Sequence, residues 1–117
     1  MIESLTARLA QLAALNQTTT YGALARDLNL TGPATIARLT DALESLMDED
    51  AAQNAPFRAA LVTGRLTGAL PAQGFFAKAE ALHRYHGQDP AQYITQERAA
   101  LFQLALAKYP TEGSGEV

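Results

Sequence analysis

Two short helical patterns separated by a turn rich in turn-forming residues restrict most strongly how this chain can fold. In residues 18–47, Thr19 or Thr20 can cap a first helix, because a threonine hydroxyl accepts from the free N–H groups of a first turn. A turn at residues 29–32 follows, and Pro33 suits the first position of a second helix, where no N–H is needed. Helix, short glycine-containing turn and second helix is the pattern of a helix-turn-helix.

The second of these helices shows one apolar face. Its apolar residues recur every three or four positions and predict an inward stripe made of Ile36, Leu39, Leu43, Leu46 and Met47. The same spacing turns Arg38 outward, with Asp41 three residues later as a weak ion-pair partner. The three acids at 48–50 are expected to form a solvated loop at the end of this helix. They do not predict a cation site, because consecutive helical residues do not converge on one cation.

Flanking segments must supply the rest of a small core. Residues 2–16 repeat apolar side chains at helical spacing and predict an amphipathic helix. Residues 57–63 have the length and β-branched ending of a strand, Gly64 supplies a turn, and residues 65–67 could return as a second strand. A β-hairpin in this place would make the helix-turn-helix a winged one.

Two more helices complete the predicted fold, at residues 75–85 and 88–109. The last one is apolar around more than half of its girth near its end. We therefore predict a mainly α fold: a winged helix-turn-helix with a small β-hairpin and an extra C-terminal helix. Residues 1–109 are expected to form one domain, followed by a polar, glycine-rich flexible tail at 110–117.

Composition narrows the function classes. Hydrophobic residues make up 48% of the 117 residues, which is typical of a globular protein. No apolar run approaches the roughly 18 residues needed to span a bilayer, and no basic segment precedes a signal-like stretch. We expect a soluble, cytoplasmic protein with no membrane partner. Nine Lys and Arg against twelve Asp and Glu give a net charge of −3, which disfavours nucleic acid unless the basic residues cluster locally.

Catalytic chemistry has few candidates in this sequence. The chain contains no cysteine and no glycine-rich phosphate loop, and its only imidazoles are His83 and His86. Two imidazoles three residues apart could share a metal ion or serve a small hydrolase. Their setting, LHRYHG, is instead typical of an exposed helix end, where a protonated histidine suits the helix dipole. We expect no enzyme, no cofactor and no metal site.

The order of short motifs resembles the DNA-binding domain of O6-alkylguanine-DNA alkyltransferases. Residues 20–25 (TYGALA) match the Thr-Tyr-Gly-x-Leu-Ala of that family, and residues 56–61 (PFRAAL) fall on its active-site Pro-Cys-His-Arg-Val-Val. Glycines of the following wing and last helix are matched up to about residue 87. Phe57 stands where the alkyl-accepting cysteine belongs, so alkyl transfer by the family's route is impossible. The chain is more similar to the alkyltransferase-like proteins, which lack that cysteine, bind alkylated DNA and mark it for repair.

This resemblance implies specific site residues. Tyr21 would help rotate a nucleotide out of the duplex, although packing of its ring under the wing is an equal alternative. Matching through Ala37-Arg38 makes Arg38 the intercalating arginine, whereas matching through Ala42-Leu43 places Ala37 there. Arg58 and Arg65 are further candidate DNA contacts. Phe57 would either close the empty alkyl pocket or form part of the core.

Two functions therefore stay open from the sequence. The first is non-enzymatic binding of duplex DNA, with alkylated or flipped bases as candidate targets. The second is a protein-interaction or dimerisation module on a winged-helix scaffold that no longer binds DNA. For the second, the stripe of Ile94, Leu101, Leu104 and Ala105, with Phe102 and Leu106 beside it, predicts a homodimer through the last helix.

Overall fold

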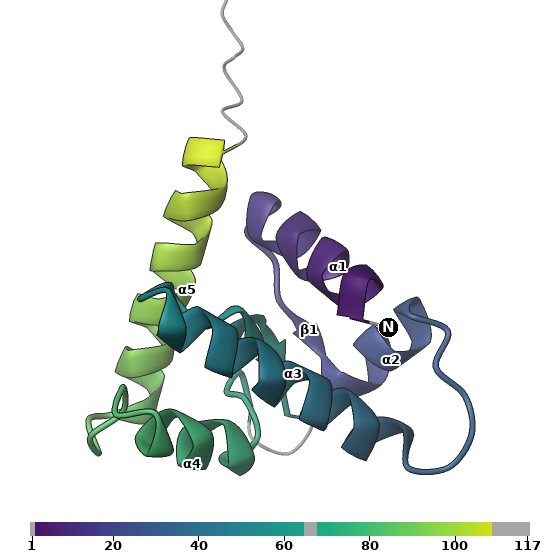
Figure 1. Ribbon diagram of the computed structural model, residues 1–117. Coiled ribbons are helices and arrows are strands. Elements are labelled where there is room, and N and C mark those ends of the chain that lie inside the picture. Colours follow the sequence, from purple (N-terminus) through teal and green to yellow (C-terminus); the bar gives the residue numbers. More distant parts are fainter. Residues whose placement is uncertain (1, 65–67, 109–117) are drawn as a thin grey trace, which may run out of the picture.

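The computed structural model describes residues 2–64 and 68–108 and shows a mainly helical chain, as the sequence predicts (Figure 1). Helix α1 spans Ile2–Ala14, α2 Tyr21–Asp27, α3 Thr35–Ala52, α4 Gln73–Ala81 and α5 Pro90–Lys108. One 3-10 helix, η1 (Arg58–Leu61), and two short strands, β1 (Thr19–Thr20) and β2 (Val62–Thr63), complete the described elements. The candidate DNA contact Arg65 and the predicted tail at 110–117 lie outside the described residues.

Helices α2 and α3 pack against each other and are joined by the turn 28–34; we call these parts the helix-turn-helix unit. Of the two candidate caps, Thr19 and Thr20, the structure selects Thr20: its Oγ1 accepts from the backbone N–H of Ala23 at 3.1 Å. Helix α3 begins two residues after Pro33, because Ala34 adopts a left-handed conformation with a φ of 57° that interrupts helical geometry.

The predicted strand at 57–63 is wrong over most of its length. Residues 58–61 form η1, and only β2 is extended. Side chains 59–63 are all buried, so the alternation that defines a half-buried strand is absent. Strand β2 pairs in parallel with β1, with Thr19 opposite Val62 and Thr20 opposite Thr63. Its described neighbour is thus the strand that leads into α2; the return strand predicted at 65–67 falls outside the described residues.

One core unites the described helices. Its largest fully buried side chains come from α1, α2, α3, η1, β2, α5 and the connecting segments: Leu5, Leu9, Leu12, Leu24, Leu39, Leu46, Met47, Phe57, Leu61, Val62, Pro71 and Ile94. The predicted inward stripe of α3 is confirmed except at its start. Ile36 is 46% exposed, because the first turn of α3 projects beyond the core and its neighbours Ala37 and Arg38 are exposed as well.

The acidic run at 48–50 is not the solvated loop expected from the sequence. Helix α3 continues to Ala52, and Asp50 is 4% exposed. The Asp50 carboxylate accepts from the backbone N–H of Arg58 at 2.9 Å and from the Arg58 Nε at 2.9 Å. A side-chain oxygen of Glu49 lies 3.4 Å from the Arg58 Nη2. Buried charge requires such pairing, and here it fixes the start of η1 against the last turns of α3.

Replacement of Asp50 should therefore destabilise the fold strongly. Asp50→Ala leaves the Arg58 guanidinium half-buried without its main partner and removes the acceptor of a backbone N–H. We expect the free energy of unfolding to fall by about 2–4 kcal/mol in urea denaturation. Asp48→Ala is the matched control, because Asp48 is exposed and its pair with Lys78 should contribute only about 0–1 kcal/mol. Equal losses for the two variants would contradict the assigned role of Asp50.

Candidate functional site

The exposed arginine of the helix-turn-helix unit lies at the first turn of α3. The Arg38 Nη2 donates to the backbone carbonyl of Thr31 at 2.6 Å, so the side chain folds back over the turn 28–34. The Thr35 hydroxyl donates to the carbonyl of Gly32 at 2.7 Å in the same turn. The expected ion pair with Asp41 is not formed among the described residues. Arg38 thus keeps its positive charge exposed at the start of α3.

Most other described basic side chains are held by protein groups. Ion pairs join Arg8 to Asp27, Arg58 to Asp50 and Glu49, Lys78 to Asp48, and Arg84 to Glu97. Arg98 donates through Nε to the carbonyl of Ala60 and through Nη2 to that of Ala69, each at 2.8 Å. Among the described side chains, the arginines without an ion pair or an η1 contact are Arg26, in the last turn of α2, and Arg38. Both belong to the helix-turn-helix unit.

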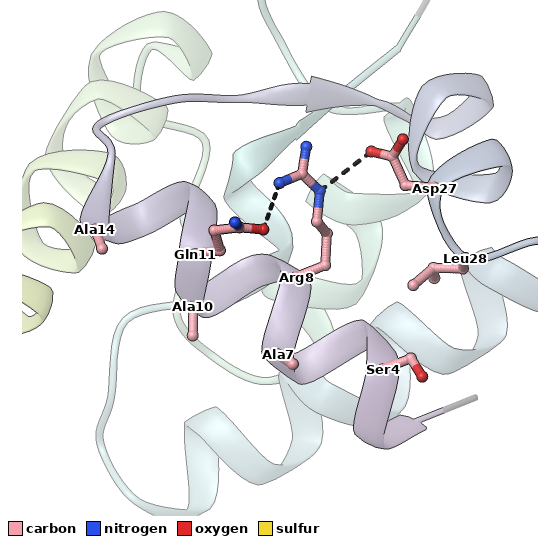
Figure 2. Close-up of a pocket in the computed structure, with 8 residues that line it drawn as sticks. All are labelled: Ser4, Ala7, Arg8, Ala10, Gln11, Ala14, Asp27 and Leu28. Atoms are coloured by element: carbon pink, nitrogen blue, oxygen red, sulfur yellow. Dashed lines mark hydrogen bonds and ion pairs between the residues drawn. The ribbon is translucent and has the colours of Figure 1, made fainter.

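Arg8 is an example of a basic side chain that is held by contacts within the protein. Its Nε donates to Asp27 at 3.1 Å and its Nη1 to the side-chain oxygen of Gln11 at 2.7 Å (Figure 2). Figure 2 shows these groups beside a shallow, open hollow along α1 that is lined by small side chains such as Ala7 and Ala14. The contact ties α1 to the end of α2, and we assign the hollow no ligand.

Tyr21 and Phe57 occupy structural positions. The Tyr21 hydroxyl accepts from the backbone N–H of Ala72 at 3.1 Å, and burial raises the pKa of this phenol. This geometry supports the packing alternative for Tyr21. Phe57 is fully buried, its ring meets Phe75 edge-on at 5.9 Å, and the Arg84 guanidinium carbon lies 4.1 Å from its centroid. Phe57 is therefore a core residue.

The hollow that the described residues form beside the Tyr21 ring is too small for a nucleobase. This hollow of about 10 Å³ is lined by Tyr21, Thr40, Leu43, Glu44, Met47, Ala59 and Phe75. A volume of this size holds at most about one water molecule. Phe57, which the sequence resemblance aligns with the alkyl-accepting cysteine, is itself fully buried.

Arg58, predicted as a DNA contact, is engaged elsewhere. Its Nε and Nη2 are bound to Asp50, and this carboxylate neutralises the guanidinium. The expectation for Arg58 is not supported by this placement, because a phosphate would have to compete with a buried carboxylate at contact distance. Sequence reasoning did not detect this role of Asp50, although its position three residues after Met47 and four after Leu46 places it on the buried stripe of α3.

Glu97 is a second carboxylate with a structural role that was not anticipated from the sequence. Its Oε1 accepts from the backbone N–H of Phe57 at 2.8 Å and from the Arg84 Nη2 at 3.3 Å. The residue lies between Ile94 and Leu101 at spacings of three and four, so an acid on the buried stripe of α5 was the available signal. Nearby, the buried Tyr93 hydroxyl has no hydrogen-bond partner among the described atoms.

Exposed acids follow Arg38 along α3 and divide this helix electrostatically. Asp41, Asp48 and Glu49 are exposed and Glu44 is partly exposed. Lys78 pairs with Asp48 at 2.9 Å, and Arg58 approaches Glu49. The start of α3 is therefore positive, whereas its later turns are acidic and partly neutralised by neighbouring side chains.

The two histidines are exposed beyond the end of α4. His83 adopts a left-handed conformation with a φ of 64°, which explains why α4 ends at Ala81 rather than at residue 85. Within residues 2–64 and 68–108, no three His, Asp or Glu side chains are grouped so that they could hold a metal ion. No helix of this described part has both the length and the apolar character to cross a membrane.

Comparison of the chain with family models, with curated proteins and with solved structures finds no match.

The Tyr93 phenol should control stability at high pH. Burial, with the negative charge of Glu97 as the next cause, raises the pKa of Tyr93 to about 12. The unfolded phenol titrates near pH 10, so the fold favours the neutral form. The contribution of the neutral Tyr93 phenol to the free energy of unfolding is fully present below about pH 10 and is lost as the pH rises towards 12. Tyr93→Phe should make the decline in the free energy of unfolding shallower in this window.

Tyr85→Phe serves as the matched control. The Tyr85 hydroxyl donates to the carbonyl of Gln88 at 2.7 Å, so this variant loses a hydrogen bond at neutral pH but should retain the high-pH decline. Tyr93→Phe should be close to neutral at pH 7, because the hydroxyl has no partner in the described structure. Urea denaturation at several pH values measures both effects. A larger loss at pH 7 for Tyr93→Phe than for Tyr85→Phe would contradict this interpretation.

Proposed function

We propose that this protein binds duplex DNA, without catalysis, through the turn between α2 and α3. The observation that carries the proposal is the distribution of basic side chains. Arg26 and Arg38 lie on the helix-turn-helix unit and form no ion pair among the described residues, and the hydrogen bond of the Arg38 guanidinium goes to the carbonyl of Thr31. Arg8, Arg58, Lys78 and Arg84 are instead paired with carboxylates, and Arg98 donates to two backbone carbonyls. Phosphate neutralisation supplies much of the affinity for DNA, and it requires arginines that are not already paired.

The start of α3 adds a second favourable feature. Ala34 precedes the helix and provides no side-chain hydrogen bond to its first turn. The N–H groups of that turn and the positive end of the helix dipole suit an anion such as a phosphate. Residues 36–38 are exposed there, and in helix-turn-helix proteins the first residues of the second helix contact the bases.

The proposed complex is weak and depends on salt. Two arginines and one helix N-terminus give few phosphate contacts, and Asp41 lies close to the same surface. With about two phosphates neutralised, the logarithm of the binding constant should fall with the logarithm of salt concentration with a slope near −2. Binding is therefore best measured at low ionic strength.

We do not propose that this protein binds a flipped base. The Tyr21 hydroxyl is bound to the backbone N–H of Ala72, Phe57 is buried, and the hollow of about 10 Å³ beside Tyr21 is too small for a base. The resemblance to alkyltransferase-like proteins supports DNA as the ligand class, and alkylated duplex remains a comparison arm of the experiment.

Arg38→Gln and Arg26→Gln should each weaken binding of a fluorescently labelled duplex and reduce the salt slope by about one unit. Fluorescence anisotropy at low salt measures both quantities. Gln96→Glu is the matched control, because it changes the net charge by the same amount at an exposed position of α5 away from the helix-turn-helix unit. This control should retain the slope and most of the affinity.

Equal effects of all three variants would show that binding depends only on the net charge of the protein, and would refute the assigned surface. Absence of binding to both plain and O6-methylguanine-containing duplex at low salt would refute DNA binding and favour the alternative of a protein-interaction module. Tighter binding to the alkylated duplex alone would restore lesion recognition to the proposal.

A further inference from the structure

The first turn of α3 combines two exposed apolar side chains with an arginine. Ile36 is 46% exposed, and Ala37 and Arg38 next to it are exposed as well. This turn lies at the edge of the molecule, beside the turn 28–34 (Figure 1). Side chains of an α-helix lean towards its N-terminus, so those of a first turn reach towards the helix end. A ligand that approaches the start of α3 therefore meets the methyl groups of Ile36 and Ala37.

Polar side chains of this first turn are already engaged by the backbone. The Thr35 hydroxyl donates to the carbonyl of Gly32 at 2.7 Å. The Arg38 Nη2 donates to the carbonyl of Thr31 at 2.6 Å, which holds the guanidinium over the turn 28–34. A hydroxyl whose hydrogen is used in this way cannot donate it to a base edge. The first turn of α3 therefore offers a base edge mainly aliphatic groups, while the guanidinium keeps a charge that suits a phosphate.

In B-DNA, thymine presents an apolar group in the major groove. This group is its C5-methyl, and apolar side chains recognise it by direct contact. The second helix of a helix-turn-helix enters the major groove with its first residues against the base edges. Ile36 carries a branched aliphatic side chain at such a position. It has no hydrogen-bonding group that would select the donors and acceptors of the other bases.

We propose that Ile36 reads thymine methyl groups in the major groove, so that the protein prefers duplexes with thymine facing the first turn of α3. The inference rests on the proposed function, because it names the sequences that the same surface selects. Arg26 and Arg38 then contact phosphates, which positions the helix and carries no sequence information. Burial of one methyl group against Ile36 corresponds to about a fourfold gain in the binding constant for each thymine contacted.

A pair of duplexes that differ only in the C5-methyl group tests the proposal. One is an alternating adenine–thymine duplex, and the other has the same length with deoxyuridine in place of thymine. The alternating sequence presents thymine in every register, so the position of the bound helix need not be known. In fluorescence anisotropy at low salt, the wild type should bind the thymine duplex about four times as tightly as the deoxyuridine duplex, or more. Ile36→Ala should bring this ratio close to one while its salt slope stays unchanged, because no charge is altered.

Leu104→Ala is the matched control, because Leu104 is 43% exposed on α5, which packs against α1 and η1. Alanine is a strong helix former at both exposed positions, so circular dichroism should show an unchanged helical content. Leu104→Ala should keep the wild-type ratio, and loss of the ratio in this variant as well would refute the assignment to Ile36.

Equal binding of the two duplexes by the wild type overturns the inference, whereas the DNA-binding function itself is retained. A ratio that persists in Ile36→Ala overturns it too, since the preference then comes from the shape of the DNA or from another residue. Absence of binding to either duplex overturns the proposed function and this inference together.

Discussion

The segment from Phe57 to Thr63 is held by side chains from several helices, and the rest of the structure depends on this attachment. Asp50 of α3 binds the backbone N–H of Arg58, and Glu97 of α5 binds that of Phe57. The segment then enters β2, which pairs with β1 directly before α2. One short stretch of chain thereby fixes α3, α5 and the entry to the helix-turn-helix unit relative to each other. Hydrogen bonds to carboxylates are stronger than neutral ones, which suits this central role.

This architecture determines where positive charge remains accessible. Arg58, Arg84 and Arg98 are used to hold η1 and α5 in place, and Arg8 joins α1 to α2. In an acidic chain whose arginines are mostly engaged in internal contacts, a polyanion can bind only where arginines without such contacts lie on the surface.

Much of the helical architecture was predictable, because apolar spacing and capping residues are local signals. Thr20 was one of two threonines that indicated the start of α2, and the stripe of Leu39, Leu43 and Leu46 indicated which face of α3 is buried. The segment 57–63 was not predictable in the same way. A short run of small and apolar residues that is buried throughout fits a strand and a 3-10 helix equally well, and only its tertiary partners decide between them.

The candidate sites show a similar division. Arg38 was correctly predicted to be exposed on the second helix, because helical periodicity determines which side of a helix faces the core. The partners of Arg58 could not be inferred from the residues around it in the sequence. Asp50 lies in a run of three acids, which suggests a solvated segment. Its position on the apolar stripe of α3 was the stronger signal. The same rule, applied to Glu97 on α5, identifies a second acid that must be paired because it faces inward.

The two carbonyl contacts of Arg98 have a consequence for how this fold can vary. One guanidinium on α5 binds the chain at Ala60 and again at Ala69, on either side of the connection that follows β2. The ends of that connection are therefore held by α5 and by the hydrogen bond from the Gly64 backbone N–H to the carbonyl of Leu70 at 2.8 Å. Lengthening a flexible loop between fixed ends costs only about 0.6 kcal/mol for each doubling of its length. Related chains could thus carry connections of different length and sequence at this point while they retain the same helical frame.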